Sequence, residues 1–224
     1  MGIQERKRRE REYRRRQITD AARKVFSNKG FTKTTMEDIA REAELSPGTL
    51  YLYFKNKDEL YASLSVEVLA HLYERLKRVY VREAPDPHAR IDHLKQALYA
   101  SYEIDPLILL NLFHLQSSDI FKTLAPPTLT TIGDLSRKCL AVIAKILAEG
   151  VESRIFIEKT PETLSDVMWA LFSGVVLWEE SKRIINQEKD YLKSTMEAAF
   201  EIFRQGITRQ SHEVLTEHSD KGRN

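Results

Sequence analysis

The residues best suited to chemistry lie in one short run, SPGTLYLYFKNK, at positions 46–57. The run combines hydroxyl-bearing, small and aromatic side chains, and it contains no carboxylate. Hydroxyl groups can hydrogen-bond phosphates or base edges, and small residues allow a nucleic acid to approach closely. A solvated helix could lack acids by chance, but such a helix rarely exposes two tyrosines and a leucine. The run therefore favours a contact with nucleic acid.

A helix-turn-helix would position this run. Ser46 can cap a short helix, and Pro47 suits its first position. A helix this short is marginal alone and needs partners. We expect one partner to open with a T-x-x-E capping box at residues 34–37, and the other to span about residues 17–28 and end at Gly30. The inward apolar positions recur every three or four residues: Ile18, Ala21, Ala22, Val25 and Phe26, then Met36, Ile39, Ala40 and Ala43, then Leu50 and Phe54.

The rest of the sequence also predicts helices, so the expected fold class is all-α. The 8 glycines and 7 prolines in 224 residues suit long helices better than a turn-rich β fold. Three capping pairs, Asp86-Pro87, Asp105-Pro106 and Thr160-Pro161, mark helix starts. The run 154–157 is strand-like but too short for a sheet. The expected helices span about residues 57–82, 87–103, 106–116, 126–150, 161–186 and 188–207.

Charge divides the chain into a basic head and an acidic body. Residues 1–57 carry 15 Lys and Arg against 8 Asp and Glu, a net charge of +7, whereas residues 58–224 carry 20 against 25, a net charge of −5. A basic head indicates a polyanionic partner, although charge also fluctuates along chains without function. The expected domains are a basic extension (1–16), a helix-turn-helix DNA-binding domain (17–57), a helical ligand-binding and dimerisation domain (58–207) and a disordered tail (208–224).

The extension contains the run ERKRREREYRRR, residues 5–16, with eight basic and three acidic side chains. Three interpretations stay open: a solvated helix, a segment on a lipid surface, or an arm that follows DNA or enters its minor groove. The lipid interpretation lacks an apolar face for insertion. We favour the arm.

The longer run TTMEDIAREAELSPGTLYLYFKNKDEL resembles the DNA-binding head of the TetR family of transcriptional regulators, and the match is close from Ile18 to Leu64. The shared elements are the T-T opening, the I-A-x-x-A helix, the S-x-G-T-L-Y-x-Y-F core and the following K-x-x-L. The resemblance implies a homodimer whose two heads bind a palindromic double-stranded DNA operator, usually as a repressor, until a small-molecule effector releases it. The basic extension departs from the family, whose members often start closer to the first helix.

The resemblance also implies which residues contact DNA. Thr35, Tyr53 and Lys57 would touch phosphates, and Leu50 and Phe54 would be core. Because the short helix has no Arg, Asn or Gln, specificity would depend on thymine methyl groups and DNA shape. The full DNA-binding set is Thr35, Ser46, Pro47, Gly48, Thr49, Tyr51, Tyr53 and Lys57.

The body shows no motif for catalysis, a cofactor or a metal. Its single cysteine, Cys139, excludes an internal disulfide and a multi-thiolate metal site. We expect an effector cavity among the middle helices, with core packing as the alternative for each residue. The apolar stretch 104–115 favours a lipophilic effector, such as an acyl chain or an aromatic compound. The candidate effector residues are Tyr102, Phe113, His114, Phe121, Trp169 and Phe172.

The last two long helices carry broad apolar stripes, which can pair with a second copy as a four-helix interface. Closing the core of the monomer is the alternative. The candidate dimer residues are Val167, Leu171, Val175, Trp178, Met196, Phe200 and Phe203.

Together these features predict a ligand-responsive, homodimeric DNA-binding regulator, a repressor and not an enzyme. Two alternatives remain. One is an all-helical small-molecule enzyme or carrier with an incidentally basic head, and the other is a DNA-binding protein whose body serves only dimerisation. The sequence has no secretory signal and no apolar run of about 20 residues, so a cytoplasmic location without a membrane partner is expected.

Overall fold

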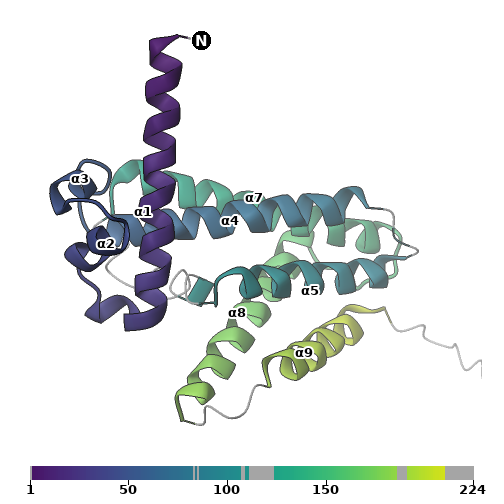
Figure 1. Cartoon of the computed structure of the whole chain (residues 1–224). Helices are drawn as coiled ribbons and strands as arrows, with labels where there is room; N and C mark the ends of the chain where they lie inside the picture. The colour runs from purple at the N-terminus through teal and green to yellow at the C-terminus, as the bar shows by residue number, and fades with distance from the viewer. Residues whose placement is uncertain are drawn as a thin grey trace, which may run out of the picture.

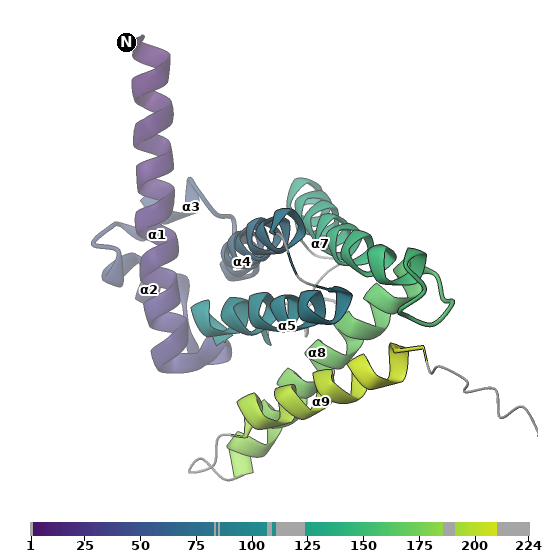
Figure 2. The ribbon, with the colours of Figure 1, turned by 90° about the vertical axis from the view of Figure 1, so that its right-hand side faces the viewer.

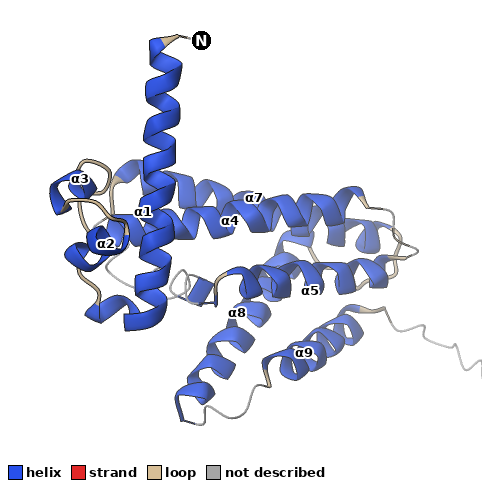
Figure 3. Cartoon of the chain, in the orientation of Figure 1, coloured by secondary structure: helices blue, strands red, loops and turns tan. Residues whose placement is uncertain are grey.

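The computed structural model describes residues 2–82, 84, 86–106, 109–110, 124–185 and 191–209, with the side chains of 184 and 185 outside the description. Every regular element in these residues is a helix (Figures 1 and 3), and an isolated bridge joins Phe156 to Thr208. This confirms the all-α fold. The helices are α1 (Ile3–Lys33), α2 (Met36–Glu42), α3 (Pro47–Tyr51), α4 (Lys57–Val81), α5 (Pro87–Ile104), α7 (Pro126–Glu152), α8 (Pro161–Ile185) and α9 (Leu192–Ile207).

The head consists of α1, α2 and α3 around a small core. The inward positions predicted from the 3.6-residue period are buried there, and Ile18, Ile39 and Leu50 are fully inaccessible. Helix α1 is interrupted at Gly30, whose φ of 74° suits glycine, and continues for one further turn. It begins at Ile3, so the basic residues 5–16 and the predicted first helix form one continuous helix.

Helix α4 belongs to both head and body. Near its start, the Tyr61 ring meets the rings of Phe26 and Phe31 edge-on, with centroids 4.9 and 4.8 Å away. Farther along, α4 packs against α5 and α7. Helix α7 packs in turn on α8, and α8 on α9, as Figure 2 shows from the side. Because one helix makes both sets of contacts, head and body share a continuous core.

Most predicted helix boundaries agree with the structure to within a few residues. Helix α3 is only five residues long, because the helical hydrogen bonding ends in a turn after Tyr51. The helix predicted at 106–116 and the tail predicted at 208–224 fall mostly outside the described residues. None of the described helices is both long and apolar enough to cross a membrane.

Candidate nucleic-acid interface

A capping box fixes the start of α2. Thr35 Oγ1 accepts a hydrogen bond from the Asp38 N–H at 3.1 Å, and Asp38 Oδ2 accepts one from the Thr35 N–H at 3.2 Å. The box predicted at residues 34–37 is therefore wrong by one residue, and Thr34 instead donates its hydroxyl to a backbone carbonyl at the break in α1. The hydrogen bonds from Lys29 and from the Thr35 N–H hold the pKa of Asp38 below its ordinary value.

A Schellman motif makes the tight turn between α2 and α3. The Leu45 N–H donates to the Ala40 carbonyl at 2.8 Å, and the Glu44 N–H donates to the Arg41 carbonyl at 3.1 Å. Glu44 itself has a φ of 54°, in the left-handed region that glycine usually occupies. The motif ends one helix and turns the chain toward the next within three residues.

Helix α3 has a buried side and an open side. The Ser46 hydroxyl caps the helix by accepting a hydrogen bond from the Thr49 N–H at 3.1 Å. Leu50 and Phe54 are buried, which confirms them as core residues. Because no carboxylate lies on the open side, a polyanion can approach it without charge repulsion. The exposed residues there are Ser46, Pro47, Gly48, Tyr51 and Leu52.

Leu52 is absent from the predicted DNA-binding set, yet its side chain is 77% exposed. It lies four residues after Gly48, a spacing that places both on one side of a helical turn. This spacing could have identified it. An apolar side chain in this position can contact thymine methyl groups.

Lys57 contacts the end of α1. Its Nζ lies 2.7 Å from the Phe31 carbonyl oxygen and 2.9 Å from that of Thr34, and 4.4 Å above the Phe31 ring. An ammonium group has three donors, so at least two hold the start of α4 against α1. Tyr53 and Lys57 are both half-buried, whereas Thr35 is exposed. Their phosphate contacts stay predictions.

Arg23 of α1 links the head to the body. Its guanidinium pairs with Glu67 of α4, and its Nε lies 3.6 Å from Asp105 Oδ2 at the end of α5. Asp105 also begins the apolar stretch in which the effector helix is predicted. Arg23 therefore adds a charged contact between the head and the end of α5 to the apolar core that they share.

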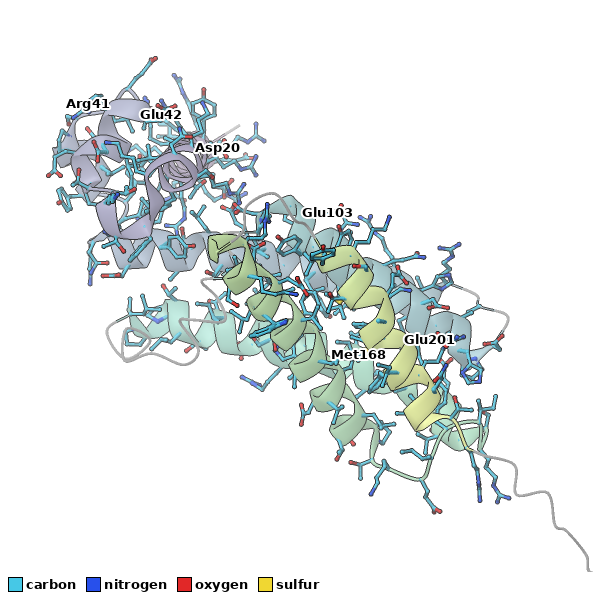
Figure 4. All side chains as sticks on the ribbon, turned by 90° about the horizontal axis from the view of Figure 1, so that it is seen from below. Asp20, Arg41, Glu42, Glu103, Met168 and Glu201 are labelled. Carbon is cyan, nitrogen blue, oxygen red and sulfur yellow. The ribbon has the colours of Figure 1, made fainter. Side chains whose placement is uncertain are left out.

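Three of the six candidate effector residues are described. Tyr102 of α5 is buried, and its hydroxyl hydrogen-bonds Glu180 of α8. Phe172 is also buried and lies beside Trp169, with 5.8 Å between ring centroids. Met168, labelled on α8 in Figure 4, is buried one turn earlier. Phe113, His114 and Phe121 lie outside the described residues.

Two surface hollows in the described residues border the body. One of about 310 Å³ lies between α1, α4 and the start of α7, and one of about 490 Å³ lies between α7 and the start of α8. Neither lining includes Tyr102, Trp169 or Phe172. The effector cavity stays a prediction.

The dimer residues predicted on α8 include two that face outward. Val167 is 49% exposed and Trp178 is 62% exposed, so both are accessible to a partner. Leu171 is half-buried, and Val175 is buried within the protomer.

The dimer residues predicted on α9 are turned inward. Met196, Phe200 and Phe203 are all buried against the rest of the body within the protomer, so their side chains are not exposed to a partner there, and their place in a dimer interface stays a prediction. The apolar stripe of α9 closes the protomer core. The large apolar side chain that α9 exposes is Ile202, which is 70% accessible.

Comparison with known proteins agrees with this geometry. Residues 18–64, which span α1 from Ile18 onward, α2, α3 and the first part of α4, match the family described as bacterial regulatory proteins of the tetR family. The HTH-type transcriptional regulator YhgD of Bacillus subtilis is 27% identical over 177 residues, which cover 78% of this chain and 89% of YhgD.

Two solved structures share the fold over nearly their whole length. The TetR family regulator PfmR from Thermus thermophilus is 20% identical, with a TM-score of 0.68 over 86% of this chain and 99% of PfmR. The regulator FadR from Bacillus subtilis, solved in complex with stearoyl-CoA, is 22% identical, with a TM-score of 0.64 over 85% of this chain and 98% of FadR. Matching motif, head geometry and helical body agree: residues 18–64 are the DNA-binding head of a TetR-family transcriptional regulator, a class of DNA-binding proteins and not of enzymes.

Proposed function

We propose that the protein is a homodimeric repressor that binds a palindromic operator through α3 of each protomer and is released by a lipophilic effector. One observation carries the DNA-binding part: the open side of α3, from Ser46 to Leu52, has no carboxylate and is held rigidly by a cap, a Schellman turn and two buried anchors. Such a surface suits a phosphate-lined groove. A cytoplasmic location follows from this role.

The homodimer is supported by the outward side of α8. Val167 and Trp178 lie eleven residues apart on one helix face, with exposed Ala170 and Gly174 between them. An exposed tryptophan on an otherwise small apolar surface is typical of an interface anchor. Ile202 of α9 replaces the three inward residues as the candidate from that helix.

The effector class is supported by the apolar stretch 104–115 and by the likeness to a regulator that binds stearoyl-CoA. We propose an acyl-CoA or a similar acyl compound. Binding in the stretch that begins at Asp105 would act on the head through the pairing of Asp105 and Glu67 with Arg23.

The test of DNA binding is fluorescence anisotropy with fragments from upstream of the protein's own gene, compared with random-sequence duplex. Tyr51→Ala should weaken binding to the preferred fragment by about tenfold or more, since it removes a side chain from the DNA-facing surface. Tyr80→Ala is the matched control, because Tyr80 is a similarly exposed tyrosine at the far end of α4. Equal affinity for the upstream fragments and random duplex would contradict the proposal.

The effector is tested on the complex with the preferred fragment, using stearoyl-CoA as the probe and coenzyme A alone as the control. We expect stearoyl-CoA to release the DNA and coenzyme A to leave it bound, because the acyl chain supplies the apolar burial. Release by neither compound would remove acyl-CoA as the effector while leaving DNA binding intact.

A further inference from the structure

The first three turns or so of α1 extend away from the rest of the protein. In Figures 1 and 2, which differ by a quarter turn, this part of α1 rises beyond every other described helix. All residues from Gly2 to Tyr13 are exposed. At about 1.5 Å per residue, Ile3–Tyr13 project over roughly 16 Å. A segment of this length with no apolar face is not maintained by packing.

Local forces explain why the extension is nevertheless helical. It continues a packed helix, so only propagation is required and the unfavourable nucleation step is avoided. Arg, Lys, Glu and Gln are all good helix formers. Two pairs at i,i+4 spacing add support: Arg9 lies 3.0 Å from Glu5, and Arg8 lies 3.8 Å from Glu12.

Two contacts show which side of α1 faces the recognition helix. The Arg15 guanidinium lies 4.4 Å above the ring of Phe54, just after α3. Gln17 Nε2 donates to the Ala43 carbonyl at 2.8 Å, just before α3. Ile18, on the face between these contacts, is buried in the head core. The side of α1 around Ile18 is therefore the α3 side.

The helical period identifies the residues of the extension on the α3 side. At about 100° per residue, those within about 60° of the direction of Ile18 are all basic, apart from Ile3 and Gln4 at the far end. The acids Glu5 and Glu12 lie about 120–140° from that direction, and Glu10 lies about 80° from it. We call the basic set the basic stripe: Lys7, Arg11, Arg14 and Arg15.

The basic stripe keeps its charge available. Among the described residues, Lys7 and Arg11 have no ion-pair partner, whereas the two extension carboxylates that pair do so with Arg8 and Arg9, outside the stripe. Arg14 donates to the neutral Gln17 side chain at 3.0 Å, and Arg15 stacks on an aromatic ring. Four cations therefore point to one side without a neutralising carboxylate.

We propose that the basic stripe is a second DNA-contacting surface, which binds backbone phosphates next to the groove occupied by α3. This rests on the proposed DNA binding and extends it by an element outside the matched residues 18–64. Phosphate contacts of this kind add affinity and fix register without reading sequence. They also make the affinity more dependent on salt.

The test is the salt dependence of binding to a long random-sequence duplex, measured with the full chain. Lys7→Ala/Arg11→Ala removes two stripe charges, and Arg6→Ala/Arg9→Ala removes two charges at the same height on the other side. Alanine preserves the helix, which circular dichroism verifies. The slope of log K against log salt is negative, and the stripe variant should make it shallower by about 1.8, since each lost phosphate contact contributes about 0.9. The control variant should change it by less than half as much.

Equal changes in the two variants would mean that only total charge matters, and this would overturn the proposal. A slope unchanged by the stripe substitutions, with reduced binding to phosphatidylglycerol vesicles, would assign the stripe to membranes and would also overturn it. Random duplex separates this test from the proposed function, which fails only if upstream fragments are not preferred. The proposed role of the basic stripe can therefore be contradicted while operator binding is confirmed, and the reverse is also possible.

Discussion

Gly48 occupies the most exposed turn of α3, and nothing in the free protein requires a glycine there. A Cβ built on it would lie 3.8 Å from the Ser46 hydroxyl, an ordinary contact, and its φ is not positive. A glycine in a helix weakens it by about 0.5–1 kcal/mol relative to alanine. The glycine therefore costs α3 some stability without a packing requirement in the free protein.

Gly48→Ala should raise the free energy of unfolding slightly and weaken DNA binding by about tenfold, because the new methyl group would meet the DNA. Gly133→Ala is the control, since its Cβ would meet nothing within 4 Å and it lies on α7. Urea unfolding and anisotropy measure the two effects. A Gly48→Ala variant with unchanged DNA affinity would show that DNA does not approach this turn.

Cys139 is buried between α7 and α4, with its Sγ 3.8 Å from the Leu69 carbonyl oxygen. Burial raises the pKa of its thiol from 9.0 to about 12. Between these values the unfolded chain loses the proton and the native protein keeps it. The free energy of unfolding therefore falls as pH rises through this window, by about 1.4 kcal/mol per pH unit for this group.

We expect Cys139 to resist iodoacetamide at neutral pH until the protein unfolds. When the pH is raised from neutral toward 10, the free energy of unfolding should fall more for the wild type than for Cys139→Ala. The extra loss should begin near pH 9.0, where the thiol of the unfolded chain starts to lose its proton. Urea unfolding at both pH values measures the difference. Rapid alkylation of the native protein would show that the α4–α7 interface opens locally.

At the scale of elements, α7 ends in the same device that separates α2 from α3. The Ile155 N–H donates to the Gly150 carbonyl and the Arg154 N–H to the Val151 carbonyl, both at 3.0 Å, and Arg154 has a φ of 59°. The turn brings the Phe156 ring over Gly150, where a Cβ would come within 2.1 Å of it. Glycine is required here by close packing.

Gly150→Ala should lower the free energy of unfolding by about 1–3 kcal/mol, the usual range for overpacking a core. In a double-mutant cycle, Phe156→Leu should remove much of that penalty by shortening the side chain. Gly133→Ala, on the same helix, should not destabilise. If Gly150→Ala proved neutral, the ring would have to move freely at this turn.

The helices were predictable because their apolar period and their caps are local properties of the sequence. Asp86 caps α5 as the Asp86-Pro87 pair predicts, and Asn56 caps α4 in the same way. The residues that cover an apolar stripe are not determined by the local sequence. The sequence predicts the apolar stripe of α9 at Met196, Phe200 and Phe203, and the structure shows that the protomer's own body buries these side chains.

In the candidate site, residue exposure followed from the pattern, and side-chain contacts did not. Leu50 and Phe54 face inward as predicted, since each must anchor a very short helix. The contacts of Lys57 with the end of α1 depend on a chain reversal 23–26 residues long, which no local pattern specifies. The apolar period predicts the first helix only from about residue 17, whereas α1 begins at Ile3, because the basic run before it is helical without an apolar face.

At the scale of the whole molecule, the proposed dimer makes the clearest prediction. Val167→Glu would bury a charge in the interface at a cost of about 3–5 kcal/mol, so dimer affinity should fall by more than about a hundredfold. Val81→Glu is the matched control, since Val81 is 76% exposed at the end of α4. Sedimentation velocity should show a monomer for the first variant and a dimer for the second. A dimeric Val167→Glu protein would move the interface away from α8.

The unbroken course of α1 from Ile3 into the head core has a consequence for how this chain can change in length. The basic stripe and the buried residues from Ile18 onward lie on one continuous helix, so the direction in which the stripe faces is fixed relative to the core. One alanine inserted after Tyr13 would rotate Lys7 and Arg11 by about 100° away from α3, whereas seven would return them to within about 20°. The extension can therefore lengthen or shorten by heptads, but not by single residues, without losing its alignment with the recognition helix.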